Sequence, residues 1–238
     1  MNRPNETWSD ISSKTPVDGF RVVGHDATLA QAAQQSPGAV IEFIPGIDSD
    51  LALGLGISLS SVTSTELIEP AHRLVPLVSM DALEVSRGGK LSHNTIAVNM
   101  VISGVLPDRG RWWHRRRLLS VFVDGKIIFA GRATTVIAAN GQFFHGLDLI
   151  PRGHPGDSCI EVQILALPVG QRKAFKRRLA TGTHVPHPGV IEARGRRVEV
   201  SWRGRRSLNI DGRDQDIEDS IVVDVRPNAY QLAWRSAP

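Results

Sequence analysis

The sequence predicts an α+β protein, in which a short N-terminal α/β unit precedes a larger region built mostly of β-strands. The first observation behind this prediction is the alternation of apolar and helix-forming segments between residues 20 and 55, which is typical of a small parallel α/β unit. The second is the sequence pattern from about Leu74 onward, where short segments of alternating apolar and polar residues are separated by Asp124-Gly125 and Asn140-Gly141. Such dipeptides favour tight hairpin turns, because both central residues adopt positive φ.

Four segments form the predicted N-terminal unit. Strand, helix, strand and helix are expected over Phe20–Val23, Leu29–Gln35, Ala39–Ile44 and Ser49–Leu55. Pro37-Gly38 ends the first helix, and Pro45-Gly46 closes the second strand, since proline and glycine interrupt regular structure.

The remainder is expected to be β-rich with one helix, at Arg172–Leu179. Strands are expected over Ile96–Ile102, Leu118–Val123, Val190–Glu192, Val198–Trp202, Ser207–Ile210, Ile221–Val225 and Gln231–Trp234. Residues 1–17 are polar and lack either hydrophobic period, so they are expected to form a flexible tail. A Ser/Thr-rich stretch places the boundary between an α/β domain at 18–65 and a β domain at 66–238.

Composition indicates a cytoplasmic protein. The single Cys159 excludes an intramolecular disulfide, and the first ten residues lack the apolar core of a signal peptide. The longest apolar stretches are shorter than the roughly 20 residues that span a bilayer. The net charge is +4, and much of the basic excess is gathered in short arginine runs. These runs favour a peripheral location at the inner membrane surface.

Three glycine/aspartate motifs stand in order along the chain: Gly24-His25-Asp26-Ala27-Thr28, Gly46-Ile47-Asp48-Ser49-Asp50 and Asp211-Gly212-Arg213. They resemble the motifs Gly-Gly-Asp-Gly-Thr, Gly-Thr-Gly-Asn-Asp and Asp-Gly-Glu of the diacylglycerol kinase-like lipid kinases. Asn140–Pro151 and Asp157–Val162 resemble two further segments of that family. The resemblance covers about residues 20–234, although each motif is altered.

The resemblance implies a fold in which an α/β domain like that of the NAD kinases precedes a C-terminal β-sandwich, with the nucleotide between them. It implies phosphoryl transfer from ATP to a lipid hydroxyl, with Mg²⁺ as cofactor. The residues carried over to nucleotide binding are Gly24, Asp26, Thr28, Gly46 and Asp50; Asp157 is carried over to metal binding and Asp211 to the catalytic motif. The N-terminal domain is shortened relative to the family, so a homodimer or a partner chain that completes the pocket stays open.

The departures from the motifs fall where chemistry is expected. His25 and Ala27 replace glycines of a phosphate loop, where a Cβ is disfavoured at positive φ, and Asp48 brings a carboxylate towards the phosphates. Arg213 replaces the expected general base, and a guanidinium cannot accept a proton. Since a positioned base contributes typically about 10²–10⁴-fold, we expect impaired catalysis, with Asp214 and Asp216 as the nearest substitutes.

Simpler structural roles remain open for the same residues. Asp26 or Thr28 can cap a helix, and Asp50 can be an acid at a helix N-terminus. Asp157 and Glu161 can lie in a surface turn and on an edge strand.

A basic aromatic run suggests a second kind of partner. Trp112 and Trp113 stand beside Arg115, Arg116 and Arg117, a combination suited to the interface of an anionic membrane. Nucleic acid is the alternative polyanion, but the sequence has no helix-turn-helix, zinc or RNA-recognition signature. The alternative to a lipid kinase is therefore a non-catalytic binding module for a membrane surface or nucleic acid.

Overall fold

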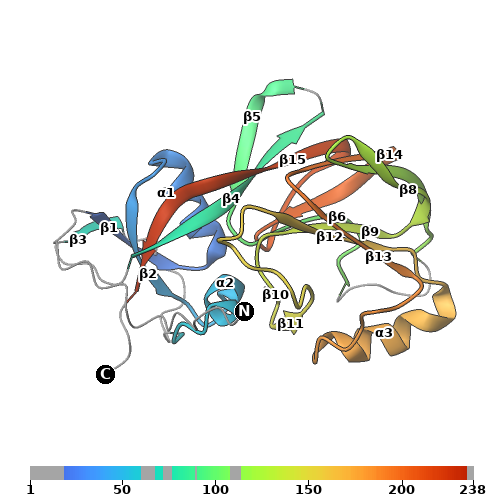
Figure 1. Ribbon diagram of the computed structural model, residues 1–238, viewed down its shortest axis with the longest axis horizontal. Helices are drawn as coiled ribbons and strands as arrows, with labels where there is room; N and C mark the ends of the chain where they lie inside the picture. The colour runs from blue at the N-terminus through green and yellow to red at the C-terminus, as the bar shows by residue number, and fades with distance from the viewer. Residues whose placement is uncertain (1–18, 60–67, 72–76, 89, 108–113, 235–238) are drawn as a thin grey trace, which may run out of the picture.

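A computed structural model describes residues 19–59, 68–71, 77–88, 90–107 and 114–234. The N-terminal unit lies at one end of the molecule, and the long strands β4 (Leu77–Arg87) and β15 (Arg213–Ala233) run from it into the β-rich region (Figure 1). Strands far outnumber helices among the described elements, so the chain is richer in β structure than the label α+β conveys.

The predicted N-terminal unit is confirmed as β1 (Gly19–Gly24), α1 (Asp26–Gln35), β2 (Val40–Pro45) and α2 (Asp50–Gly54). β1 and β2 are parallel, with Phe20 opposite Ile41. α1 begins three residues earlier than expected, because His25 is its N-cap and Asp26 to Thr28 form its first turn. Ser49 caps α2, with its hydroxyl accepting a hydrogen bond from Ala52 N.

The sheet continues from this unit into the rest of the chain. β3 (Ile68–Ala71) pairs antiparallel with β1, and the end of β15 at Gln231–Ala233 pairs parallel with β2. β4 pairs with β15 along most of its length, and β5 (Lys90–Ala97) pairs with β4. The last strand of the chain therefore returns to the first unit; the domain boundary near residue 65 stays a prediction.

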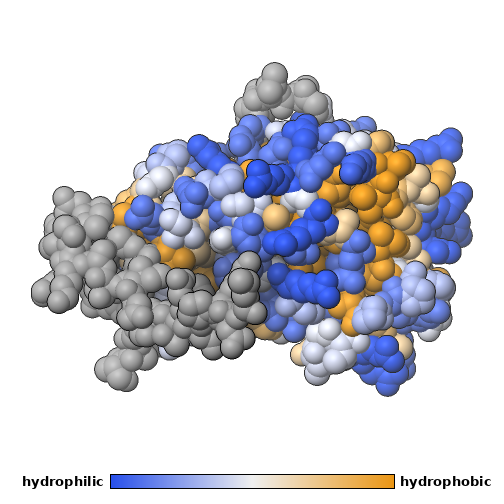
Figure 2. Space-filling view, in the orientation of Figure 1, coloured by the Kyte–Doolittle hydropathy of each residue, from blue (hydrophilic) through white to orange (hydrophobic). Residues whose placement is uncertain are grey.

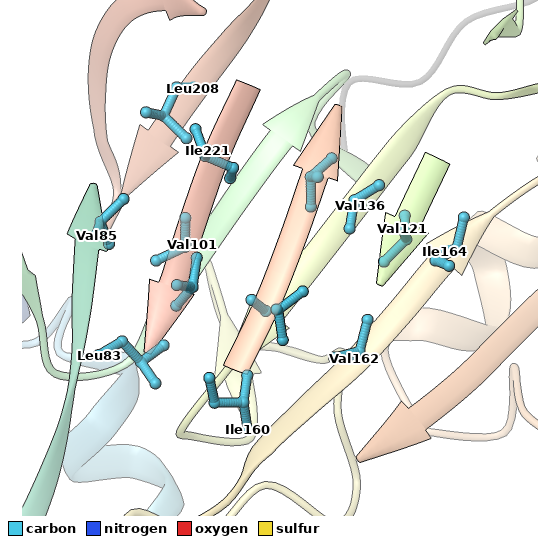
Figure 3. Packing of buried hydrophobic residues seen from close by; sticks show 14 of the residues in the cluster. Leu83, Val85, Val101, Val121, Val136, Ile160, Val162, Ile164, Leu208 and Ile221 are labelled. Atoms are coloured by element: carbon cyan, nitrogen blue, oxygen red, sulfur yellow. The ribbon is translucent and has the colours of Figure 1, made fainter. Parts of the chain in front are cut away.

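The β-rich region is built around β14 (Arg197–Ile210), which pairs with β15 along one edge and with two different strands along the other. Its first half pairs with β7 (Arg117–Val123), and its second half pairs with β6 (Met100–Gly104). The neighbouring strands are β8 (Lys126–Ala133), β9 (Thr135–Ala139), β12 (Ile160–Leu165) and β13 (Val190–Gly195). Buried aliphatic side chains from these strands pack together, among them Val121, Val136 and Val162 (Figure 3).

Several predicted strand limits were wrong. The predicted strand Ile96–Ile102 is interrupted, because the N–H groups of Val98 and Asn99 bind the Asp211 carboxylate instead of a neighbouring strand. The segments Val198–Trp202 and Ser207–Ile210 belong to the single strand β14, whose pairing with β15 shifts register between them. Ile221–Val225 and Gln231–Ala233 likewise belong to β15.

One of the two predicted hairpin turns is confirmed. Asp124 and Gly125 have φ of 49° and 75° and join β7 to β8. Asn140-Gly141 was wrong as a hairpin, because both N–H groups bind Asn99 O and the chain does not return along β9. Gly141 is required by close packing instead, since a Cβ there would lie 2.1 Å from Asn99 Oδ1.

The hairpin of this segment lies a few residues later. His145 and Gly146 have φ of 49° and 71° and join β10 (Phe143–Phe144) to β11 (Leu147–Asp148). The predicted helix is confirmed as α3 (Arg172–Leu179), preceded by the 3-10 turn η3 (Val169–Gln171). Phe175 and Leu179 of α3 pack into the same buried cluster as Phe144.

Candidate functional site

The structure brings the first two motifs together at the carboxyl edge of β1 and β2. Gly46 N donates a hydrogen bond of 2.7 Å to Gly24 O, which joins the two loops through their main chains. Gly24 has φ of 140°, where a Cβ would be strained. His25 has an extended backbone and Ala27 is helical, so the expectation that their φ values require glycine was wrong. What His25 adds is a ring, whose Nδ1 lies 3.3 Å from Thr28 Oγ1.

Asp26 has a buried carboxyl group that holds the second loop in place. Its two oxygens accept hydrogen bonds from Ser49 Oγ at 2.6 Å and from Leu51 N at 3.0 Å. Burial is the main cause that raises the pKa of Asp26 from 3.8 to about 8, and the nearby Asp211 carboxylate adds to it; the bonds from Ser49 and Leu51 act the other way. Asp26 therefore caps the start of α2 from inside the protein.

Asp211 of the third motif is buried beside this pair of loops. Its carboxylate accepts hydrogen bonds from the N–H groups of Val98, Asn99 and Met100 at 2.8–3.0 Å. Burial raises its pKa to about 6, although these bonds and the charge of Arg213 lower it. Asp211 has φ of 48° and is followed by Gly212 in the turn between β14 and β15. Asp211 thus links this turn to the residues that join β5 to β6.

Two buried residues of this region were missed by the sequence analysis. Tyr230 is fully buried, and its hydroxyl has no hydrogen-bond partner among the residues that the structure describes. Burial, then the charges of Asp211, Asp26 and Asp81, raise its pKa well above the ordinary value. The carboxylate of Asp81 accepts bonds from Ser158 N and Asn228 N. The sequence feature that could have identified Asp81 is an acidic residue within the apolar segment that forms β4. The junction of the N-terminal unit with the β region is therefore an acidic, buried network.

Asp50 joins the N-terminal unit to the hairpin of β10 and β11. Its carboxylate oxygens accept hydrogen bonds from His145 N at 2.6 Å and Gly146 N at 2.8 Å. Burial raises the pKa of Asp50, which these two bonds partly oppose. Both oxygens thus have partners within the chain, which favours a structural role for Asp50.

We expect Asp50→Ala to lower the free energy of unfolding by about 2–4 kcal/mol, because two main-chain N–H groups lose a charged acceptor. Urea unfolding measures the effect, and Asp48→Ala is the control, since Asp48 is an exposed neighbour in the same loop. Equal stability of the two variants would contradict the structural role and would favour a role of Asp50 in ligand binding.

The predicted metal ligand Asp157 lies in an ion-pair cluster just before β12. Arg194 contacts Asp157 at 2.5 Å and Glu161 at 3.0 Å. Within the described parts of the chain, no group of three or more His, Cys, Asp or Glu side chains is placed to hold a metal ion. A guanidinium between the two carboxylates occupies the place a cation would take, so these residues do not fit a Mg²⁺ site in this arrangement.

The predicted membrane-binding residues are only partly described. Trp112 and Trp113 lie outside the described residues. Arg115, Arg116 and Arg117 are exposed at the start of β7, and Arg116 Nη1 donates a hydrogen bond to Ala166 O at the end of β12. They belong to the β region and do not contact the glycine loops.

Two cavities flank the buried network. One of about 180 Å³ lies between α1 and β5, and Asp211 and Arg213 line it together with Ala27. The other, of about 400 Å³, lies where α2, the start of β4 and the loops at 141–142 and 153–156 meet. Its apolar wall consists of Leu51, Leu55, Val78, Met80 and Trp234. Its volume falls in the range of about 300–1,000 Å³ typical of small-molecule sites.

Comparison with protein families decides the relationship of the chain. Residues 111–234 match the family described as the YegS C-terminal NAD kinase beta sandwich-like domain. The chain belongs to this family. The β-sandwich expected from the resemblance is confirmed by this match.

Solved structures share the fold at low sequence identity. A diacylglycerol kinase from Bacillus anthracis str. Sterne is 13% identical, with a TM-score of 0.66 over 90% of this chain and 75% of that chain. The yeast NADH kinase, solved with NADH, is 14% identical, with a TM-score of 0.50 over 91% of this chain and 61% of that chain. No curated protein sequence matches the chain significantly. No helix in the described part of the chain is both long and apolar enough to cross a membrane.

The arrangement of the two glycine loops determines how well they can fit a nucleotide phosphate. A phosphate cradle needs main-chain N–H groups that converge on an anion. Here the N–H groups of Gly46, Ser49 and Leu51 are bonded within the protein. The exposed side chains of Ile47 and Asp48 occupy the tip of the second loop. The loops keep their place in the fold, but they fit a phosphate poorly.

Proposed function

We propose that the chain is a catalytically impaired member of the diacylglycerol kinase-like lipid kinases, one that binds a lipid without phosphorylating it. The observation that carries the proposal is the position of Arg213. It lines the cavity beside Asp211 and α1, where the resemblance expects the carboxylate that takes the proton of the lipid hydroxyl. A guanidinium cannot perform that step.

The contacts of the other motif aspartates support the same proposal. Asp26 and Asp50 bond internal donors with both oxygens, so in this arrangement they contribute to folding. Asp48 adds negative charge where the phosphates of ATP would approach, which opposes nucleotide binding. Nucleotide binding and phosphoryl transfer are thus both weakened, by different residues.

The larger cavity supports a retained binding role. Its wall combines apolar side chains with the polar groups of Ser79, Gln142 and His154. This is the composition of a site that buries an apolar body and orients a small polar head. A diacylglycerol suits that chemistry, as does a related lipid whose polar head is about as large as that of diacylglycerol.

Calorimetric titration tests the proposal. We expect short-chain diacylglycerol to give saturable binding, and ATP with or without Mg²⁺ to give none at millimolar concentration. A parallel assay with radiolabelled ATP is expected to detect no phosphorylated lipid. Micromolar ATP binding together with lipid phosphorylation would overturn the proposal, and the absence of lipid binding would remove its binding half.

A further inference from the structure

The hairpin of β7 and β8 carries an unusual concentration of exposed aliphatic side chains. Ile127 is 57% exposed, Leu118 37% and Ile128 36%. β8 pairs only with β7, so it is an edge strand of the described sheet. In Figure 2, hydrophobic surface gathers over the right-hand part of the molecule, where Figure 1 places β8, β9 and β13, with hydrophilic residues around it. Clustered apolar exposure of this kind marks an interaction surface.

A β-bulge accounts for the exposure of two consecutive isoleucines. Val121 pairs with Phe129 and Phe122 pairs with Ile127, so Ile128 is the extra residue between them. In a regular strand, neighbouring side chains point to opposite faces, whereas a bulge re-aims one of them. Ile127 and Ile128 are therefore both left in solvent, while Phe129 packs against the buried core.

Basic residues surround these aliphatic side chains. Lys126 and Arg132 are exposed at the two ends of β8, and Arg132 is the cross-strand neighbour of Leu118. Arg115, Arg116 and Arg117 are exposed where β7 begins. The acid of the hairpin turn, Asp124, is engaged by the N–H groups of Arg196 and Arg197. The hairpin thus presents apolar side chains within a predominantly positive rim.

We propose that the β7–β8 hairpin docks on the surface of an anionic membrane, with Leu118, Ile127 and Ile128 among the lipid headgroups and Arg115–Arg117, Lys126 and Arg132 against the phosphates. Shallow apolar insertion combined with cationic contacts is how peripheral proteins bind such surfaces. The insertion stays shallow, because the free edge of β8 needs hydrogen-bond partners that hydrocarbon does not supply. The surface lies apart from the motif loops, so docking requires no nucleotide.

Two other occupants fit this surface less well. Single-stranded nucleic acid combines contacts of cations to its backbone with stacking of its bases on exposed aromatic rings. The two rings of this hairpin, Phe122 and Phe129, are half-buried, and its exposed large apolar side chains are aliphatic. A second copy paired along β8 is disfavoured by the terminal cations and the bulge, two features with which natural proteins protect edge strands from pairing.

Co-sedimentation of the full chain with vesicles tests the proposal, without nucleotide or diacylglycerol. We expect binding to phosphatidylglycerol–phosphatidylcholine vesicles, and little binding to phosphatidylcholine alone. The double variant Ile127→Ser/Ile128→Ser and the single variant Arg132→Glu should each weaken binding roughly tenfold. The matched controls are Ile217→Ser, at an aliphatic side chain 50% exposed elsewhere, and Arg226→Glu, at an exposed arginine of β15; both should bind as the unmodified chain does.

Each other outcome would overturn the proposal. Absence of vesicle binding, or equal binding to neutral vesicles, would remove the anionic membrane as the partner. Unchanged binding by the hairpin variants would assign the membrane contact to another basic cluster. A change of sedimentation coefficient in Ile127→Ser/Ile128→Ser without vesicles would show that a second copy covers the surface. Circular dichroism checks that all four variants fold.

Discussion

The unmodified protein should lose stability as the pH rises from about 6 to about 9, and Asp26→Asn should remove most of that loss. The pKa of Asp26 is about 8 in the folded chain, against about 3.9 when unfolded. The folded state therefore holds a proton that the unfolded state releases. Its stabilising effect is complete below about pH 4 and disappears as the pH passes through about 8.

Asp211 acts with the same sign over a narrower range. Its folded pKa of about 6 places its loss of stability between about pH 4 and 6. Above pH 6, the contribution of Asp26 continues to decline and amounts to roughly 2–3 kcal/mol over two pH units. This separation allows the two carboxylates to be distinguished by their pH ranges.

Urea unfolding at pH 6 and pH 9 provides the measurement for Asp26. The unmodified chain should be less stable at pH 9, whereas Asp26→Asn should have nearly the same free energy of unfolding at both values. Asp48→Asn, at an exposed carboxyl group nearby, is the control and should keep the full decline. An equal decline in Asp26→Asn would show that Asp26 is ionised in the folded protein at pH 6.

The local parts of this fold could be predicted from sequence because local signals determine them. The strand–helix–strand–helix order and α3 follow from short-range periodicity, and Asp124-Gly125 makes its turn with its own backbone. The interruption at Val98 and Asn99 could not be predicted in this way, because Asp211, 112 positions from Asn99, provides the acceptor. The role of Gly141 likewise depends on the distant side chain of Asn99.

The motif residues of the candidate site could be predicted from sequence, but their contacts could not. The motif resemblance located Asp26, Asp50 and Asp211, but their hydrogen-bond partners belong to other segments of the chain. Asp26 bonds Ser49 and Asp50 bonds the turn at His145, so residues expected to contact nucleotide serve contacts between elements. Tyr230 was missed because its place among three carboxylates depends on β15 returning to β2.

Loss of phosphoryl transfer should have two separable causes, one in the loops and one at Arg213. We expect the loop variant His25→Gly/Asp48→Gly to bind ATP but to transfer phosphate only at a background rate, because it removes a ring and a charge but supplies no base. Arg213→Glu alone should neither bind ATP nor transfer phosphate, since the loops remain unfavourable. The three substitutions together should transfer phosphate to diacylglycerol about 10²–10⁴-fold faster than the loop variant.

The introduced glutamate is suited to act as a base because of its neighbours. It would line the cavity beside Asp211, a buried carboxyl group, and the mutual repulsion of two carboxylates raises their pKa values towards neutrality. The triple variant with Arg213→Gln in place of Arg213→Glu is the control, since an amide of similar shape cannot take the proton. Equal rates for these two triple variants, measured with radiolabelled ATP, would show that position 213 does not supply the base. Turnover at about 1–100 s⁻¹ by the unmodified chain, the ordinary range of kinases, would show that Arg213 leaves catalysis intact.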